Sequence, residues 1–237
     1  MRKLSIGVLA VTAAAALALA GCGSSGGGST AEPAGSSPAV AGKVGVILPD
    51  TKSSARWENN DRPSLEAAFT AAGVESNIQN AQGDVPKFGE ICDAMITEGV
   101  KVLMIVNLDS DSGSACLKKA TAAGIATIDY DRLTLGGGAN FYVSFDNVQV
   151  GALQGEGLIT CLDEAEVTKA NIVFINGAAT DNNATLFKQG YQEALQPKFD
   201  SGDYTLVGDQ TGNWEPDKAQ SVMEDFLTAQ KGDIQGA

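Results

Sequence analysis

Histidine is absent from the sequence, and this absence removes several kinds of chemistry at once. A Ser-His-Asp triad, a Cys-His pair and a histidine-based zinc site are all excluded. Carboxylates remain as acid and base groups, but no matched pair of the kind that glycoside hydrolysis needs is recognisable. We therefore expect no metal and no cofactor, and of the acid–base chemistries only that of carboxylates stays open.

Basic residues are also few. The chain has 16 Lys and Arg against 29 Asp and Glu, which gives a formal net charge of −13. A nucleic-acid partner would require a basic face, so no nucleic-acid binding is expected. The segment LPDTKSSARW at 48–57 has neither the G-x-G-x-x-G nor the G-x-x-x-x-G-K-S/T spacing of a phosphate loop. A nucleotide ligand is therefore not indicated.

Long apolar runs are limited to one, at the N-terminus. A basic start is followed by the run Ile6–Ala20 and by LAGC at Leu19–Cys22, the layout of a secretory signal peptide. Small residues directly before a cysteine resemble a bacterial lipobox, in which the cysteine is lipidated. A membrane-spanning helix is the alternative, but the run is short for a span. We predict a signal peptide and lipobox over 1–22, with Cys22 as the lipidation site.

Glycine and serine dominate the residues that follow Cys22. This composition cannot bury a core, so we predict a flexible tether over 23–42. The mature protein is then expected outside the cytoplasm, where its lipid anchor alone holds it to the outer face of the cell membrane.

From Lys43 onward, short apolar segments alternate with helical segments. Three junctions look alike: AAGV at 71–74, TEGV at 97–100 and AAGI at 122–125. Each is typical of a helix end, a left-handed glycine (Gly73, Gly99, Gly124) and a new strand. Further strands are predicted at FYVSF, NIVFING and YTLVGDQ. Strands that alternate with helices predict a doubly wound α/β fold around a parallel sheet.

Ligands of such sheets bind beyond the carboxyl ends of the strands. The polar residues predicted at these ends are Asp50, Asn80, Asn107, Asp109, Asp131, Arg132, Asn176 and Asp209. One polar strand end alone is more often solvated than functional, but several that converge on one edge indicate a site. Carboxylates, amides, an arginine and two tryptophans suit a neutral polyol, because the polar groups pair with hydroxyls and an indole packs against C–H groups.

Five motifs, in this order, carry a family resemblance: ARW at 55–57, YDRL at 130–133, FYVSFDN at 141–147, DNNATLFK at 181–188 and VGDQ…W at 207–214. The chain from about Lys43 onward resembles the bacterial periplasmic sugar-binding proteins of ABC importers, most closely their xylose-binding branch. The resemblance implies the type I periplasmic-binding-protein fold. It has two doubly wound parallel-sheet lobes, here an N-terminal lobe over 43–147 and a partial C-terminal lobe over 148–237.

The resemblance also implies binding roles in the first lobe. Arg56 would hydrogen-bond the sugar from the first loop, and Trp57 would stack on one face of the ring. Asp131 and Arg132 would hold hydroxyls from the end of the fourth strand. Without the resemblance, Trp57 could equally cap the first helix, and Asp131 and Arg132 could form a surface ion pair of little energetic value.

Three further residues of the second lobe complete the implied site. Asn183 would contribute its amide, and Trp214 would close the other face of the ring. Lys188 stands where xylose binders tend to carry an arginine that contacts the sugar, and a lysine offers a point charge instead of a planar fork. The structural alternative for Trp214 is packing beside Pro216 at a helix start.

The expected mechanism is closure of two lobes around a monosaccharide, with the first crossing between lobes near SFDN at 144–147. Such binding makes and breaks no bond, so we expect that the protein is not an enzyme. The expected partners are the sugar, with xylose favoured over other aldopentoses and aldohexoses, and the permease subunits of an ABC importer.

A sensor that presents sugar to a chemoreceptor or sensor kinase is the alternative. Sugar-sensing repressors share the fold but carry a DNA-binding segment where this chain has an export signal. An exported carbohydrate-acting enzyme would be revealed by turnover of glycosides.

Three cysteines remain if Cys22 carries lipid. Cys92 and Cys116 fall on the second and third predicted helices, which right-handed crossovers place side by side on one sheet face. Cys161 falls beyond the crossing, in the other lobe. We predict a Cys92–Cys116 disulfide, which an oxidising compartment favours; the alternative is three buried, inert thiols.

The chain ends in AQKGDIQGA, a predicted helix end followed by the start of a strand. Beyond Asn147 the sequence predicts two clear strands and this stub, whereas a lobe of this kind needs about five strands. We expect the second lobe to be incomplete and the chain to be the N-terminal portion of a longer protein. We also expect it to bind sugar more weakly than the whole.

Overall fold

The structure is a computed structural model that describes residues 42–237. The predicted signal peptide, the Cys22 lipidation site and all but the last residue of the predicted tether lie outside the described residues. Within 42–237, no helix combines the length and the apolar character needed to cross a bilayer.

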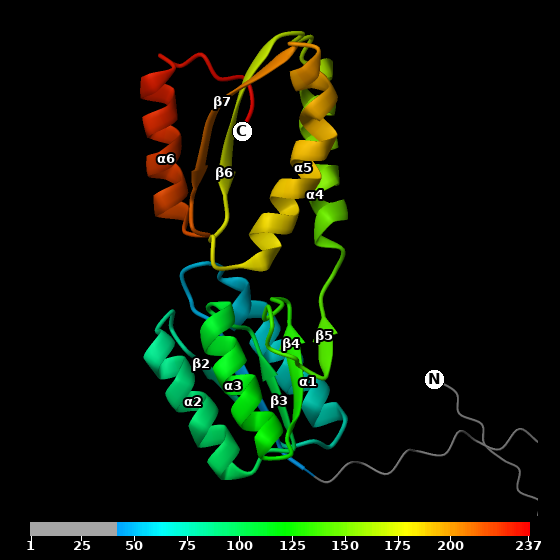
Figure 1. The fold of residues 1–237 in the computed structure, drawn as a ribbon, viewed down its shortest axis with the longest axis vertical. Helices are drawn as coiled ribbons and strands as arrows, with labels where there is room; N and C mark the ends of the chain where they lie inside the picture. Colours follow the sequence, from blue (N-terminus) through cyan, green and yellow to red (C-terminus); the bar gives the residue numbers. More distant parts are fainter. Residues whose placement is uncertain (1–41) are drawn as a thin grey trace, which may run out of the picture. The chain divides into compact units, whose positions relative to one another are not determined.

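The first part of the chain forms a five-stranded sheet with the order β2-β1-β3-β4-β5, in which every pair of neighbours is parallel. We call this part the first lobe (Figure 1). Its elements are β1 (Val44–Leu48), the π-helical turn η1 (Trp57–Asp61), α1 (Arg62–Ala71), β2 (Ser76–Asn80), α2 (Val85–Glu98), β3 (Val102–Ile105), α3 (Ser110–Ala122), β4 (Ala126–Tyr130) and β5 (Phe141–Val143).

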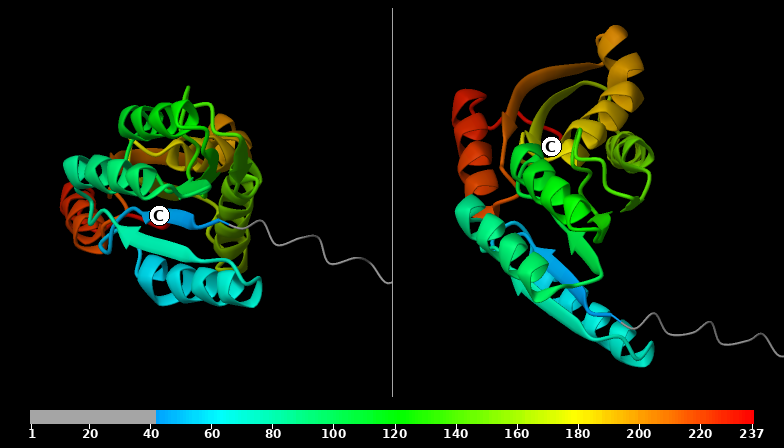
Figure 2. Two further views of the ribbon diagram at one scale, coloured as in Figure 1. Left: turned by 90° about the horizontal axis from the view of Figure 1, so that it is seen from below. Right: turned by 60° about the horizontal axis from the view of Figure 1, so that its bottom comes forward.

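Two apolar layers cover the faces of this sheet. Strand β1 is buried along its whole length, and its alternating side chains face opposite layers. Ile47 packs with Phe88 and Leu117 of α2 and α3, whereas Val46 packs with residues of η1 and α1. Figure 2 shows α1 on one side of the sheet and α2 and α3 on the other. The predicted doubly wound arrangement is confirmed.

The predicted junction glycines all adopt left-handed backbone conformations, with φ of +67° at Gly73, +81° at Gly99 and +72° at Gly124. A residue with a Cβ is strained there, which explains why these helix ends carry glycine. Cys92 of α2 and Cys116 of α3 form a disulfide with a Cα–Cα distance of 5.9 Å, the pairing that we predicted. Cys161 is a free, exposed cysteine.

A second sheet follows, with two parallel strands. We call this part the second lobe. Its elements are α4 (Asn147–Glu164), β6 (Ala170–Asn176), α5 (Asn182–Asp200), β7 (Tyr204–Thr211) and α6 (Pro216–Ala229). Ile172 of β6 also makes an isolated parallel bridge with Gly236. The two strands and the stub near the end of the chain are those that the sequence predicts.

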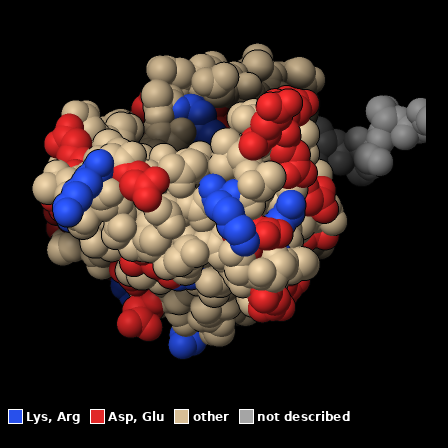
Figure 3. Space-filling view, turned by 90° about the horizontal axis from the view of Figure 1, so that it is seen from above, with Lys and Arg blue, Asp and Glu red and all other residues tan. Residues whose placement is uncertain are grey.

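Apolar residues cover both faces of the second sheet as well. Phe174 and Leu195 belong to a cluster between β6 and the helices α4 and α5, and Val222 and Phe226 of α6 pack with Val173 on the other face. Strand β7 is largely exposed beyond Tyr204. On the face in Figure 3, Lys and Arg side chains lie singly among acidic and uncharged surface.

Candidate ligand-binding site

A pocket of about 250 Å³ opens where the carboxyl ends of first-lobe strands meet the start of α5 and the loop after β7. Its volume is below the roughly 300–1,000 Å³ of sites for drug-sized ligands, so it suits a small molecule. Charged, amide and aromatic side chains share its lining: Ser53, Ser54, Arg56, Trp57, Asp131, Arg132, Phe145, Asp181, Asn183, Phe187 and Trp214. Six of the seven residues predicted to bind sugar are among them.

Asp131 follows β4 directly and has a left-handed backbone with φ of +64°, which is unusual for a residue other than glycine. Its main chain is pinned by several bonds: its N–H donates to Val143 O at 2.8 Å, and its carbonyl oxygen accepts from Ser144 Oγ at 2.9 Å. This turn aims the carboxylate at the pocket. The strained backbone is maintained by its neighbours, a pattern that is common at binding sites.

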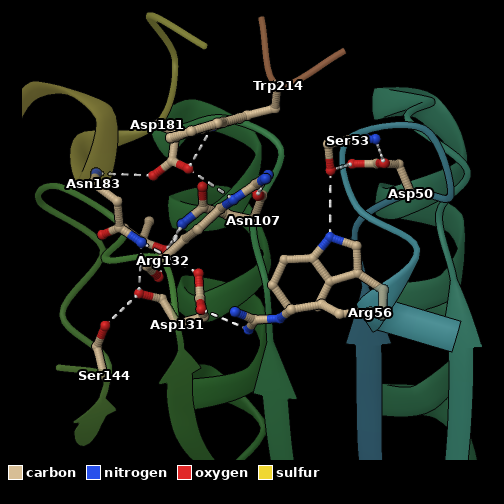
Figure 4. Close-up of polar contacts among 12 residues, drawn as sticks. Asp50, Ser53, Arg56, Asn107, Asp131, Arg132, Ser144, Asp181, Asn183 and Trp214 are labelled. Carbon is tan, nitrogen blue, oxygen red and sulfur yellow. Dashed lines mark hydrogen bonds and ion pairs between the residues drawn. The ribbon is translucent and has the colours of Figure 1, made fainter. Parts of the chain in front are cut away.

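Arg56 lies between the carboxylates of Asp61 and Asp131. Figure 4 shows its ion pair with Asp131. Its Nη2 donates to Asp131 Oδ2 at 2.7 Å, and its Nε donates to Asp61 Oδ2 at 2.9 Å. Burial favours the neutral guanidine, but the charges and hydrogen bonds of Asp131 and Asp61 outweigh it and raise the pKa of Arg56 further. The guanidinium is therefore a permanent cation at the edge of the pocket.

Arg132 and Asp181 form the most buried ion pair of the site, with side chains 8% and 4% exposed. The Nε of Arg132 lies 3.0 Å from Asp181 Oδ2, yet its N–H does not make a well-oriented hydrogen bond. Burial raises the pKa of the Asp181 carboxyl, against the opposing effects of Arg132 and of hydrogen bonds from Asn183 N and Trp214. The alternative interpretation, a surface ion pair between Asp131 and Arg132, does not hold, since Asp131 pairs with Arg56 and Arg132 with Asp181.

Asn183 is buried at the start of α5 and reaches Asp131 from the second lobe. Its Nδ2 donates to the carbonyl oxygen of Asp131 at 3.1 Å and to Oδ1 at 3.2 Å (Figure 4). Its own Oδ1 has no hydrogen-bond partner among the described residues. Asn183 Oδ1 and Arg132 Nε are thus two buried polar atoms without a well-oriented hydrogen-bond partner, although Nε is ion-paired with Asp181.

Trp57 differs from the expectation of an open stacking surface. It is only 3% exposed, and the guanidinium carbons of Arg56 and Arg132 lie 4.2 and 5.7 Å from its ring centroid. Its Nε1 donates to Ser53 Oγ at 3.3 Å. Trp57 therefore supports the two arginines through cation–π contacts and leaves little ring surface for a ligand.

Trp214 is the more open of the two indoles. Its Nε1 donates to Asp181 Oδ2 at 3.1 Å, and its ring meets Phe187 edge-on with centroids 6.1 Å apart. The ring also packs against Gly177, where an added Cβ would overlap it. Asn213 and Trp214 have φ of +57° and +62°, so this loop is bent sharply to place the indole.

The remaining predicted residues lie elsewhere. Lys188 is not part of the pocket lining, because its Nζ pairs with Asp209 Oδ2 at 2.6 Å. Most of the polar strand ends make internal hydrogen bonds instead of facing a ligand. Asp50 accepts from Ser53 N, Asp109 caps α3, and Asn176 donates to Asp209. Of the polar strand ends, only Asp131 and Arg132 line the pocket.

The residues that the sequence did not single out are Asp181, Phe145, Phe187, Ser53 and Ser54. Asp181 has a dual position, since its Oδ1 caps α5 by accepting from Asn183 N at 2.9 Å while Oδ2 faces Arg132 and Trp214. An aspartate directly before a helix is usually interpreted as an N-cap alone, so a binding role is easily overlooked. The sequence feature that could have indicated the binding role of Asp181 is its position at the start of the DNNATLFK motif.

A different cavity of about 250 Å³ lies against β6. Apolar side chains such as Leu158, Phe174 and Leu195 dominate its lining, which contains no Asp, Glu, Lys or Arg. Convergent polar groups distinguish a specific ligand site from an apolar gap. We therefore place the candidate site at Asp131 and Arg132.

Comparison with known proteins agrees with this geometry. A model of the periplasmic binding protein domain matches residues 44–237. The chain belongs to this family. It is 36% identical over 197 residues to the multiple sugar-binding periplasmic receptor ChvE of Rhizobium radiobacter, a match covering 79% of this chain and 55% of the relative. It is 34% identical over 193 residues to the D-xylose-binding periplasmic protein of Escherichia coli K12, covering 81% and 56%.

Solved structures of this family have the same fold. A carbohydrate transporter solute binding protein from Chloroflexus aurantiacus, in complex with D-glucose, superposes with a TM-score of 0.71 at 33% identity, covering 78% of this chain and 60% of that chain. A solute binding protein from Mycobacterium smegmatis with bound glycerol gives 0.73 at 28% identity, covering 81% and 64%. The chain spans about 55% of the length of the curated relatives named above.

Proposed function

We propose that this protein captures a monosaccharide in the pocket around Asp131 and Arg132 and does not transform it. The observation that carries the proposal is the pocket lining, in which the Arg56–Asp131 and Arg132–Asp181 ion pairs lie beside Trp214 and Phe187. Sugar hydroxyls donate to carboxylates and accept from guanidinium groups. These charged groups, together with Trp214 and Phe187, match a ligand with polar edges and an apolar face.

Binding would couple the two lobes. Asn183 contacts Asp131, and Asp181 contacts Arg132, so the same side chains that face the pocket also link α5 to the end of β4. A sugar that bonds to both sets of groups stabilises the closed arrangement and selects it over an open one. We propose that the closed form delivers sugar to the permease of an ABC importer. The protein would act outside the cytoplasm, lipid-anchored through Cys22.

Xylose is our first choice of ligand. A relative 34% identical to this chain is named as a D-xylose-binding protein, and the pocket of about 250 Å³ is small. Another relative is named as a multiple sugar-binding receptor, and a similar structure holds D-glucose. We therefore propose xylose first, and behind it other aldopentoses such as arabinose and aldohexoses such as glucose or galactose.

A thermal-shift screen tests this proposal directly. The purified chain is heated with xylose, arabinose, ribose, glucose, galactose or an amino acid, each up to high millimolar concentration. A ligand that binds only the folded state raises the melting temperature by mass action, with about 2.7 kcal/mol of stabilisation at 100 times Kd. A rise with xylose that is lost in Asp131→Asn supports the proposal. A rise with amino acids but no sugar would contradict it.

A sensory role is the second candidate, and the names of two relatives favour it. One is called a receptor, and a structure 26% identical to this chain is the fructose binding periplasmic domain of a hybrid two component system. The discriminating experiment adds sugar-loaded protein to a reconstituted importer. Stimulated ATP hydrolysis by the importer indicates transport, whereas sugar-dependent capture by a sensor domain without that stimulation indicates sensing.

A further inference from the structure

The turn that carries Arg56 has an unusual helical geometry. Residues Trp57–Asp61 form a π-helical turn, in which the N–H of Arg62 bonds to the carbonyl oxygen of Trp57 five residues earlier. Arg56 itself has helical backbone angles, φ −60° and ψ −34°. Such turns are rare, and they often occur at functional sites.

This geometry decides which side chains are neighbours. In an α-helix, with 3.6 residues per turn, positions five apart are separated by about 140° around the axis, so Arg56 and Asp61 would diverge. The extra residue in a π-helical turn brings positions i and i+5 onto one side. Asp61 Oδ2 consequently accepts from Arg56 Nε at 2.9 Å, although the two residues are not at the usual i,i+4 spacing.

Asp61 is itself held in place. Its other oxygen, Oδ1, accepts from the hydroxyl of Tyr130 at 2.7 Å, and its side chain is only 12% exposed. Tyr130 belongs to β4 and immediately precedes Asp131 in sequence. The carboxylate therefore ties the Arg56 guanidinium to the strand that supplies the centre of the pocket, although Asp61 does not line that pocket.

The side chain of Arg56 is 41% exposed, and Asp61, Asp131 and the ring of Trp57 together fix its guanidinium. With Nε bound to Asp61, Nη2 is directed at Asp131 and the planar group lies over Trp57, 4.2 Å from the ring centroid. Without Asp61, a long exposed arginine side chain would sample several rotamers and lose the orientation that a planar, bidentate donor needs.

We propose that Asp61 is a positioning residue, which the π-helical turn places beside Arg56 so that the guanidinium is oriented toward Asp131 and the pocket before a ligand arrives. The expected effect of Asp61 on ligand affinity rests on the proposed function. The orientation itself is a property of the ligand-free protein. The two can therefore be tested separately.

The first experiment needs no sugar. In a Trp214→Phe background, Trp57 is the single tryptophan of the chain, and its emission reports the cation above its ring. Asp61→Asn should shift this emission, because the guanidinium loses its fixed place. The matched control is Glu58→Gln in the same turn, which weakens the pair with Arg62 at 2.5 Å and leaves Arg56 untouched. Unchanged emission in Asp61→Asn would overturn the positioning role.

The second experiment is a double-mutant cycle on xylose affinity, measured by calorimetry, with Asp61→Asn and Arg56→Ala singly and together. We expect Asp61→Asn to weaken binding about 5- to 30-fold, and to have almost no effect when Arg56 is already alanine. Asp61→Glu should restore part of the affinity, while Glu58→Gln stays at the starting value. Equal losses from Asp61→Asn in both backgrounds would show that Asp61 acts independently of Arg56.

The outcomes separate the two proposals. If the unsubstituted chain binds no monosaccharide, the proposed function fails, and the Trp57 emission still decides whether Asp61 orients Arg56. If sugar binds tightly and Asp61→Asn changes neither affinity nor emission, the function stands and the positioning role is refuted. Melting temperatures of all variants identify any that unfold. If Asp61→Asn does, Tyr130→Phe, which removes the hydroxyl that holds Asp61, takes its place in both experiments.

Discussion

The two lobes contribute to one pocket from very different scaffolds. In the first lobe, a five-stranded sheet contains the fully buried β1, and a disulfide joins two of the covering helices. In the second, two strands form the sheet and most of β7 is exposed. Asp131 and Arg132 thus follow a strand inside a well-covered sheet, whereas Asn183 and Trp214 lie at a helix start and in a loop.

The difference shows two ways to hold a binding residue in place. Asp131 is fixed by backbone bonds to the neighbouring β5 strand. Trp214 is fixed locally instead, by a left-handed backbone, by the closeness of Gly177 and by the Asp181 carboxylate. We expect the placement of Asp131 to survive substitutions in the second lobe. The placement of Trp214 should depend on its few short-range contacts.

The largest expected effect is on the stability of the first lobe. Replacing Cys92 and Cys116 by serine should lower the free energy of unfolding by about 3–4 kcal/mol, because the bridge closes a loop with a sequence separation of 24. Urea denaturation of the double variant against the unsubstituted chain measures this loss. Cys161→Ser in the second lobe is the control and should change little, since that thiol is exposed and free. Equal midpoints for all three proteins would contradict the prediction.

Substitution of Asp131 should separate binding from stability. Asp131→Gly removes the partner of Arg56 and of Asn183 and should cost about 2–4 kcal/mol of sugar binding. The same change relieves a left-handed backbone and should not lower the melting temperature. Asparagine tolerates a left-handed backbone, so Asp131→Asn should weaken sugar binding without changing the backbone strain at this position. Calorimetry and thermal unfolding measure the two effects, and a glycine variant that binds normally would refute the assignment.

Much of the fold could be predicted because it rests on local rules. The glycines at the helix ends and the alternation of strands and helices are visible in the sequence, and helix order alone places Cys92 beside Cys116. The end of β4 could be predicted as part of the site because binding residues of parallel sheets gather at that edge.

The partners of the charged residues could not be predicted in the same way. Arg56 contacts Asp61 because η1 is a π-helical turn, which has about one more residue per turn than the expected α-helix. No residue pattern in this segment predicts a π-helical turn. Lys188 pairs with Asp209 and does not line the pocket. The sequence does not show which of these two distant places a lysine side chain will reach. Trp57 is buried beneath two guanidinium groups, because its ring completes an apolar layer with Val46 and Leu48.

A smaller effect should follow from displacing Trp214 without removing it. Gly177→Ala introduces a Cβ that overlaps the indole, so the ring must move from its place between Asp181 and Phe187. We expect a loss of about 1–3 kcal/mol in sugar binding, similar to Trp214→Ala. Gly177 has no left-handed backbone, so alanine is not strained there by itself. Affinities measured for Gly177→Ala, Trp214→Ala and the combination test this, and additive losses would show that Gly177 acts elsewhere.

The smallest effect concerns Tyr130, which lies on the first-lobe side of the pocket. Burial and the hydrogen bond to Asp61 raise the pKa of Tyr130 to about 12. The phenol therefore keeps its proton in the folded state where the unfolded chain, with an ordinary pKa near 10, begins to lose it. The folded state binds more protons in this window, so the unfolding free energy falls as pH rises from about 10 to 12.

Tyr130→Phe should reduce this pH dependence, and Asp61→Asn should lower the pKa of Tyr130 because it removes a carboxylate that disfavours the phenolate. Tyrosinate absorbance during an alkaline titration follows all the phenols, and the difference between the unsubstituted chain and Tyr130→Phe isolates the contribution of Tyr130. Tyr191 of the second lobe provides the comparison, since burial raises its pKa to about 12 as well but Asp61 is not among the causes. Asp61→Asn should therefore shift the titration of Tyr130 and leave that of Tyr191 unchanged. A titration curve identical to that of the unsubstituted chain would show that Asp61 does not control the proton on Tyr130.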